Sequence, residues 1–329
     1  MRYGLPRLGS KNAIATWVVS ELPSAETFVD VCGGGGSVTH AAMLSGKYKK
    51  FILNDVDARL PKLFLDCVQG KYTVDTHNEW ISKAEFDEKK KTDAFIALVW
   101  SFGNNGKDYL YAADKSDFKH AYHRAIYFNE VDGMEPYGIK LTLSTKPGVY
   151  DRYLEYQKQI RSQIKDKHIQ LQHLTNFRGL EELERLQGLE RIKGVQDLQG
   201  LSLPDIQIYG VDYADVPIPE TDRVIYVDPP YYGRRCDGYD GFDHKRFWEW
   251  ADKQDNIFIS EYSMPDNFVK YAWQKKKILS CNDNSGGYAK EIIWTNQRTY
   301  DKLSEDRQEM AKWNFAEQMT IFDLMGGAT

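Results

Sequence analysis

Short apolar runs alternate with amphipathic helical patterns along much of this chain, and this alternation limits its fold more than any other feature. Runs rich in Val, Ile and Phe are typical of buried strands, and they lie at residues 27–32, 51–53, 223–227, 256–260 and 291–295. Residues 59–68 have the i, i+3, i+4, i+7 apolar spacing of a helix. Another helix is predicted over 12–22, with Ser10 before it as a cap. Strands and helices in alternation predict an α/β fold with a doubly wound sheet.

Between about residues 70 and 205 the alternation stops, and the chain becomes polar, charged and rich in Tyr. This composition indicates an inserted domain. The predicted organisation is a discontinuous domain over 1–69 and 206–300, an insertion over 70–205, and a C-terminal helix and tail over 301–329.

Basic residues gather inside the insertion. Residues 137–180 contain eight Lys or Arg against three acidic residues, and a polyanion is expected to bind where such an excess lies. Lys140, Lys146 and Arg152 are the candidate contacts. A solvated, mixed-charge helix over 150–167 is the simpler interpretation of the same residues.

A six-residue repeat follows, LERLQG, LERIKG and VQDLQG over 183–200. Its apolar residues recur at every third position, so on a straight helix they would spiral around the axis. Gly188, Gly194 and Gly200 weaken a helix further. The period therefore favours a short β-solenoid turn, with the role of a structural spacer.

The most specific motif is Asp228-Pro229-Pro230-Tyr231, directly after the predicted strand 223–227. It places a carboxylate, a rigid carbonyl and an aromatic ring where doubly wound sheets bind ligands. Acceptors at Asp228 and the Pro229 carbonyl can bind both N–H groups of an aromatic amine, so that its lone pair faces a methyl donor. Tyr231 can stack on a base that has left the duplex. The motif predicts amine methylation.

A glycine-rich segment follows the first strand. Asp30, Val31 and Cys32 lead into Gly33, Gly34, Gly35 and Gly36, and Asn54 and Asp55 follow the second strand. Glycines let a cofactor approach the backbone, and an acid about twenty residues later can hold ribose hydroxyls. Val38 stands where the dinucleotide fingerprint needs its last glycine, so a nucleoside without pyrophosphate is favoured over NAD.

Taken in order, these motifs resemble those of the Dam-type (class alpha) DNA adenine-N6 methyltransferases, including phage-type members. The likeness covers roughly residues 1–57 and 206–297. It implies a Rossmann-like, S-adenosylmethionine-dependent methyltransferase fold with a mixed sheet and an inserted target-recognition domain. The implied reaction is methyl transfer from S-adenosylmethionine to adenine N6 in duplex DNA after base flipping. Gly9-Ser10-Lys11 stands where the family usually has Gly-Gly-Lys, and Cys32 with four glycines replaces an FxGxG-like loop.

The resemblance also implies cofactor contacts. Lys11 matches the lysine of the amino-terminal cofactor motif, Asp30 would meet the methionine part, and Asp55 the ribose. Asp212 and Tyr213 match an acidic-aromatic pair that contacts the cofactor adenine. The full implied set is Lys11, Asp30, Cys32, Gly33, Gly34, Gly35, Asp55, Asp212, Tyr213 and Asp228.

Three further segments are candidate binding sites. Residues 100–106 resemble a segment that leads into DNA-contacting structure, so Asn104 and Asn105 are candidates for reading adenine edges, although a Gly-Asn-Asn turn is the default explanation. Residues 232–242 suit a loop over the flipped base, with Arg234 and Arg235 for phosphates; an exposed flexible loop is the alternative. Residues 318–324 resemble a peptide that docks on the bacterial replication sliding clamp. Its anchors would be Gln318, Met319, Ile321 and Phe322, unless these residues pack on the core.

Other observations narrow the class. The net charge of -5 excludes a protein that binds polyanions by bulk charge. Four separated cysteines argue against a zinc ribbon or disulfide scaffold, and His120 and His123 have no third ligand nearby, so no metal is expected. With no apolar run long enough to span a membrane, a cytoplasmic monomer is predicted.

Two other functions remain open at this point. Cytosine-N4 methylation uses the same amine chemistry, although that family more often has Ser in place of Asp228. A non-catalytic DNA-binding or cofactor-sensing protein is the other alternative, and the intact motifs argue against it.

Overall fold

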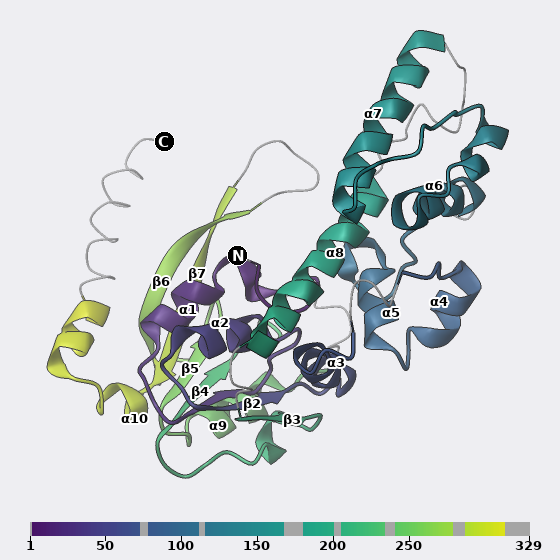
Figure 1. The fold of residues 1–329 in the computed structure, drawn as a ribbon. Coiled ribbons are helices and arrows are strands. Elements are labelled where there is room, and N and C mark those ends of the chain that lie inside the picture. Colours follow the sequence, from purple (N-terminus) through teal and green to yellow (C-terminus); the bar gives the residue numbers. More distant parts are fainter. Residues whose placement is uncertain are drawn as a thin grey trace, which may run out of the picture. The chain divides into compact units, whose positions relative to one another are not determined.

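The computed structural model describes residues 2–72, 78–111, 116–167, 180–200, 205–233, 241–278 and 287–312 (Figure 1). The chain divides into two compact units. We call Lys11–Lys62 with Ser202–Thr329 the sheet unit, and Met1–Ser10 with Leu63–Leu201 the helical unit. The first ten residues thus group with the inserted segment, whereas the sequence assigns them to the discontinuous domain.

A seven-stranded sheet in the order β3-β2-β1-β4-β5-β7-β6 forms the sheet unit. The strands are β1 (Thr27–Asp30), β2 (Lys50–Asn54), β3 (Asp205–Tyr209), β4 (Arg223–Val227), β5 (Ile257–Ser260), β6 (Phe268–Ile278) and β7 (Gly287–Asn296). The first five strands are parallel, and β7 runs antiparallel to both β5 and β6. This mixed sheet confirms the predicted α/β class. All five predicted runs overlap strands, while β3 and β6 were not predicted.

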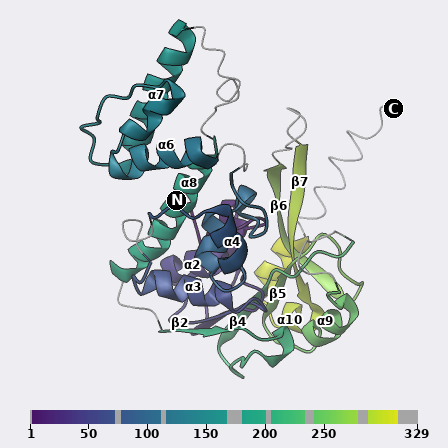
Figure 2. The same cartoon turned by 90° about the vertical axis from the view of Figure 1, so that its right-hand side faces the viewer.

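The central strands are buried on both faces, which is why they appear in the sequence as continuous apolar runs. Val29, Ile225 and Ile259 share a cluster with Phe247 of α9 (His244–Ala251). On the other face, Phe28 stacks on Tyr226 with ring centroids 6.5 Å apart. Helices α1 (Ala15–Glu21) and α2 (Ser37–Ser45) lie on one side of the sheet and α9 on the other (Figures 1 and 2).

Helix α3 (Arg59–Val68) is confirmed, but the helix predicted over 12–22 begins three residues too early. A 3-10 turn, η1 (Lys11–Ala13), comes first, and α1 begins after Ile14 with no side-chain cap. Ser10 is not a cap, because its hydroxyl accepts a hydrogen bond from Arg191, 2.9 Å away. Lys11 lies in this 3-10 turn, and its side chain is buried.

The sheet reverses its order between β1 and β4. These strands are neighbours, and the chain moves outward through β2 and β3 on one side and through β5 on the other. Ligands of doubly wound sheets bind at such a switch point, beyond the carboxyl ends of the strands. Asp30 ends β1, and Asp228 directly follows β4.

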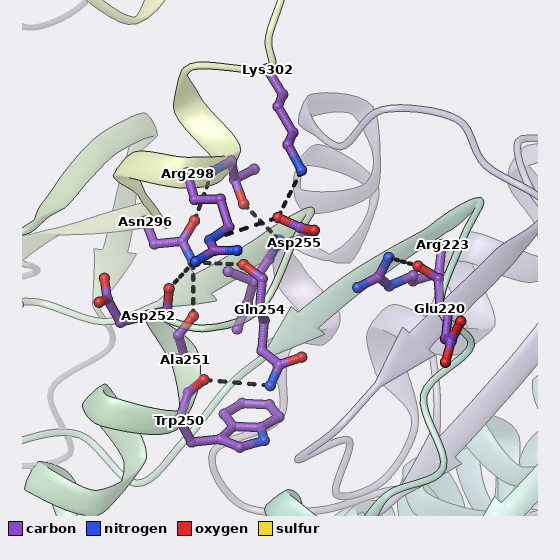
Figure 3. A network of polar contacts seen from close by, with 12 residues as sticks. Glu220, Arg223, Trp250, Ala251, Asp252, Gln254, Asp255, Asn296, Arg298 and Lys302 are labelled. Carbon is purple, nitrogen blue, oxygen red and sulfur yellow. Dashed lines mark hydrogen bonds and ion pairs between the residues drawn. The ribbon is translucent and has the colours of Figure 1, made fainter.

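Asn296, the last residue of β7, lies at the end of the sheet away from Asp30 and Asp228 (Figure 3). Its amide nitrogen donates to the carbonyl oxygens of Ala251, Asp252 and Gln254, at 2.8, 3.2 and 2.7 Å. Nearby, Lys302 binds Asp255 at 2.8 Å. These contacts hold the turn that leads from α9 into β5.

Helices predominate among the described residues of the helical unit. They are α4 (Lys83–Lys89), α5 (Ala94–Val99), α6 (Ser116–Phe128), α7 (Val149–Lys167) and α8 (Leu180–Gln196), with 3-10 turns η2 (Phe102–Asn104), η4 (Asp132–Tyr137) and η5 (Asp197–Gly200). Ser82 and Glu85 form a capping box at the start of α4. None of the helices in the described ranges is long and apolar enough to cross a membrane.

The β-solenoid expectation is wrong, because most of the repeat forms α8 and its end forms η5. The residues at every third position are nevertheless buried: Leu186, Leu189, Ile192, Val195 and Leu198. The spiral stripe is covered because α8 has different neighbours along its length. A Cβ at Gly188 would lie 3.6 Å from Pro6, and one at Gly194 would lie 3.5 Å from the Arg2 carbonyl. Both distances are those of ordinary van der Waals contact, so the N-terminal segment lies against this part of the helix.

Candidate active site

The tetrapeptide after β4 forms an ion pair with a buried lysine. Lys11 Nζ lies 2.9 Å from Asp228 Oδ1 and donates to the Tyr231 hydroxyl at 2.6 Å. The same ammonium lies 4.6 Å from the centre of the Tyr231 ring. The structure therefore brings together Lys11, Asp228 and Tyr231, which the sequence separates by more than 200 positions.

A second carboxylate belongs to this cluster. Glu291 of β7 has its Oε2 3.9 Å from Lys11 Nζ, and it accepts a hydrogen bond from the Tyr231 hydroxyl at 3.3 Å. Burial alone lowers the pKa of Lys11, but Asp228 and Glu291 outweigh burial and raise that pKa above its ordinary value. Lys11 is therefore an ammonium. Sequence reasoning missed Glu291, although an acid within the apolar run 291–295 was a usable signal.

Two further residues hold the loop that contains the tetrapeptide. His244 Nε2 donates to the Pro230 carbonyl at 2.9 Å. Glu261, which follows β5, accepts from the backbone N–H groups of Tyr232 and Tyr262 at 2.9 and 2.7 Å. Burial raises the pKa of Glu261. Sequence reasoning missed both residues, because neither stands in a recognisable motif.

Asp30 is a buried carboxylate with one oxygen in use. Its Oδ2 accepts from the Thr39 hydroxyl at 2.7 Å, while its Oδ1 has no hydrogen-bond partner within the described part of the chain. Burial, opposed by the Thr39 bond and reinforced by the charges of Asp228 and Asp55, raises the pKa of Asp30 to about 7. Asp30 is thus suited to a cationic hydrogen-bond donor.

The glycine loop must be free of side chains at two positions. A Cβ at Gly33 would lie 2.2 Å from Leu53 Cδ1 and 2.9 Å from Asp30 Cγ. Gly34 has φ +52° and donates its N–H to Asp55 Oδ2 at 2.9 Å. Gly35 follows in the same loop. These contacts place Asp55 beside the loop and keep the backbone accessible.

Cys32 lies at the start of this loop and is half-buried. Burial and the neighbouring carboxylates, Asp55 first among them, raise the pKa of its thiol well above the ordinary value. The thiol is therefore protonated at neutral pH and is a poor nucleophile.

Asp212 and Tyr213 lie just after β3, and both contact Arg246. Burial works to raise the pKa of Asp212, but bonds from Arg246 and the Ala214 amide lower it below its ordinary value. The Arg246 bond is bidentate, at 3.0 and 2.9 Å. The Tyr213 ring is buried, with the Arg246 guanidinium 5.1 Å from its centre. Asp30, Asp55, Asp212 and Asp228 follow or end four adjacent strands, so all four carboxylates lie at one edge of the sheet.

Two asparagines predicted to contact DNA form hydrogen bonds within the turn after α5. Asn104 has φ +51° and donates its side-chain amide to the Leu98 carbonyl at 2.9 Å. Asn105 donates to Asp108 at 2.8 Å and accepts from the backbone N–H groups of Lys107 and Asp108. The geometry therefore favours the turn over base reading.

The three basic candidates of the helical unit differ in their surroundings. Arg152 donates to the carbonyls of Ile126 and Tyr127 at the end of α6, and to those of Lys146 and Pro147. Arg152 therefore has a structural role, whereas Lys140 and Lys146 are exposed. The other candidates lie outside the described residues: Arg234, Arg235, Gln318, Met319, Ile321 and Phe322.

The two histidines of α6 lie among aromatic rings. His120 stacks on Trp80 with centroids 4.9 Å apart, and His123 Nε2 donates to the Asn78 carbonyl at 2.8 Å. Within the ranges that the structure describes, no three His, Cys, Asp or Glu side chains are grouped to hold a metal ion.

Comparisons with known proteins give one family. The family model described as D12 class N6 adenine-specific DNA methyltransferase matches residues 8–183, more than half of the chain. A search of curated proteins finds no match. The matched range includes the glycine loop and ends before the Asp-Pro-Pro-Tyr tetrapeptide, so the geometry of that tetrapeptide is a separate observation.

Proposed function

The chain belongs to the D12 class N6 adenine-specific DNA methyltransferase family, and from this membership we propose which residues carry out its reaction. Membership makes DNA the substrate and adenine N6 the methyl acceptor, and it implies S-adenosylmethionine as the methyl donor. The roles proposed below follow from the positions of the acids at the sheet edge.

The position of Asp228 supports it as the residue that binds the target amine. It follows β4 at the switch point of the sheet, next to the strand that ends in Asp30. In our proposal, a flipped adenine donates one N6–H to Asp228 and the other to the Pro229 carbonyl, so that the nitrogen lone pair faces the methyl donor. Tyr231 stacks on the base. This juxtaposition of Asp228 and Asp30 is the single observation that carries the assignment.

The described residues fit the implied cofactor. S-adenosylmethionine carries an ammonium and a sulfonium, and the buried Asp30 offers an oxygen with no partner in the described part of the chain. Gly33 and Gly34 leave the backbone open there, and Asp55 lies beside them for the ribose. We assign Asp212 and Tyr213 to the cofactor adenine, with Arg246 sharing the Asp212 carboxylate. When bound, the cofactor supplies an electrophilic methyl group on sulfur.

The proposed methyl transfer is direct and needs no covalent bond between enzyme and substrate. Bound S-adenosylmethionine would supply the methyl group to the adenine N6 lone pair and would leave as the neutral thioether, while Asp228 and the Pro229 carbonyl hold the amine in position. The methylated nitrogen is then cationic, and it loses one proton to the carboxylate of Asp228, from which the proton passes to solvent. The protonated thiol of Cys32 takes no part.

Finer points of DNA and partner binding are also proposals. The exposed side chains of Lys140 and Lys146 are assigned to phosphates, with Arg234 and Arg235 on the loop after the tetrapeptide. The C-terminal peptide with Gln318 and Phe322 is assigned to the sliding clamp on its sequence alone.

The test is methylation of unmethylated plasmid DNA by the purified protein with S-adenosylmethionine, with every base scored by long-read sequencing. N6-methyladenine in one short sequence context is expected. Asp228→Ala should abolish the mark and keep cofactor binding, whereas Asp266→Ala, at an exposed acid of the same unit, should leave both unchanged. A methyl-transferring Asp228→Ala enzyme refutes the assignment.

A further inference from the structure

We propose that Glu291 is a positioning residue, which takes up the charge of Lys11 when Asp228 binds the target adenine. The inference rests on the role of Asp228 proposed above. It concerns the state of the site after Asp228 has exchanged its lysine partner for the amine of the base.

The need for a second carboxylate follows from the burial of Lys11. Its side chain is only 9% exposed, and its ammonium forms a 2.9 Å ion pair with Asp228 Oδ1. An adenine amine that binds Asp228 competes for this carboxylate. Removing the partner of a buried charge is strongly unfavourable, so the lysine would hold Asp228 and exclude the base unless another anion lay within reach.

Glu291 meets this need. Its side chain is 5% exposed, and its Oε2 already lies 3.9 Å from Lys11 Nζ. A movement of about 1 Å brings the two atoms to the distance of a charge-assisted hydrogen bond. Glu291 is fixed on β7, so the short movement belongs to the lysine, whose long side chain has the rotamer freedom for it.

Tyr231 joins the two carboxylates into one network. Its hydroxyl accepts from Lys11 at 2.6 Å and donates to Glu291 at 3.3 Å. As the ammonium moves from Asp228 toward Glu291, it remains beside this hydroxyl. The same arrangement holds the ring that is proposed to receive the flipped base. Glu291 thus acts on the substrate through Lys11, without touching the reacting atoms.

The exchange has a signature in the pH dependence of the reaction. The charged or titratable groups that act on Lys11 are Asp228, Glu291, Tyr231 and Tyr262. Replacing Glu291 with Gln removes one carboxylate, which lowers the pKa of Lys11. The lysine of the variant therefore loses its charge at a lower pH than the lysine of the wild type, and a neutral lysine no longer needs an anion and releases Asp228. Activity lost at neutral pH should therefore return as the pH rises.

The experiment compares Glu291→Gln and Glu291→Asp with the wild type. Transfer of labelled methyl to unmethylated plasmid is measured from pH 6.5 to 9.5. At pH 7 we expect kcat/KM for DNA to fall at least tenfold in Glu291→Gln, with the Kd for S-adenosylmethionine within twofold of wild type. The ratio of variant to wild type should rise with pH. Glu291→Asp, which keeps the charge, should lose less and show no such rise.

A matched control and a double variant separate this role from a structural one. Glu21→Gln removes a half-buried carboxylate from its 2.8 Å pair with Arg307, outside the site, and should match wild type. Because Glu291 acts through Lys11, adding Glu291→Gln to Lys11→Met should cause no further loss. This comparison needs only the residual rates of the two Lys11→Met enzymes, so it stands if the single Gln variant fails to fold.

Three results have distinct meanings. Wild-type kcat/KM in Glu291→Gln at every pH overturns the inference, and so does an equal, pH-independent loss in the Gln and Asp variants. A further loss in the double variant also overturns it. An inactive wild type would instead refute the proposed function.

Discussion

Binding of S-adenosylmethionine should weaken about tenfold between pH 8 and pH 6, because Asp30 must be ionised to receive the cation of the cofactor. In the protein without cofactor, burial and neighbouring acids hold the pKa of Asp30 at about 7. At pH 8 most of the carboxyl is therefore already a carboxylate. At pH 6 most of it is protonated, and binding must first release that proton.

The magnitude follows from this pKa alone. If the bound ammonium returns the pKa of Asp30 to its ordinary range near 4, the observed Kd rises about elevenfold at pH 6 above its high-pH limit, but only about 1.1-fold at pH 8. The number of protons released on binding is then about 0.9 at pH 6 and about 0.1 at pH 8. Stability without cofactor has the opposite sign. Because the folded pKa is raised, the contribution of Asp30 is present below pH 4 and lost as the pH rises through 7.

Isothermal titration calorimetry in two buffers of different ionisation enthalpy measures both the Kd and the protons released. Asp30→Asn should bind the cofactor more weakly than wild type, and its proton release gives the baseline for the ionisation of the cofactor itself. Thr39→Val removes a hydrogen bond that lowers the pKa of Asp30, so it should move the midpoint to higher pH. An unchanged Kd from pH 6 to 8, or the same proton release in Asp30→Asn as in wild type, would refute the reasoning.

Three other predictions concern the backbone, the helical unit and the tail. Gly33→Ala should weaken cofactor binding at least tenfold in calorimetry and lower the Tm, because the new Cβ would meet Leu53 Cδ1 at 2.2 Å; wild-type binding contradicts this. Arg152→Ala should reduce the free energy of unfolding by about 2 kcal/mol in urea without changing the salt dependence of DNA binding. Lys140→Ala should leave the free energy of unfolding unchanged and lower the slope of log affinity for DNA against log salt concentration by about 1. If Arg152→Ala changed the slope and Lys140→Ala changed the stability, the two roles would be exchanged. Deleting 318–324 should abolish retention on immobilised sliding clamp and leave methyl transfer unchanged, and retention of the shortened protein would end the clamp hypothesis.

Strands and motifs at their ends were accessible from the sequence because both depend on local chemistry. The apolar run 223–227 is buried on both faces of the sheet. Asp228, directly after it, lies at the carboxyl ends of the parallel strands, as predicted. By contrast, β3 and β6 are partly polar edge elements, so their periodicity is weak. The inner strands of the sheet were therefore predictable, and its two outer strands, β3 and β6, were not.

Contacts between distant segments explain the remaining differences. Residues 2–6 lie against α8 although they stand about 180 positions earlier in the chain, and no repeat period contains this contact. Glu291 and His244 hold the tetrapeptide only because β7 and α9 return to it. The side chains of Asn104 and Asn105 form hydrogen bonds with backbone groups of the turn. Residue type alone does not distinguish such contacts from contacts with a base.

The pairing of the two central strands has a consequence for how the protein is made. β1 lies beside β4 through Thr27 and Arg223, about 200 positions apart, and a ribosome adding about 5–20 residues per second takes about 10–40 s to pass from one to the other. During most of that interval β1 and β2 have emerged without either outer neighbour, because β3 and β4 are both synthesised after the inserted segment. The catalytic sheet is therefore completed after the helical unit, and a substitution that slows the folding of the helical unit would appear first as aggregation of the uncovered strands.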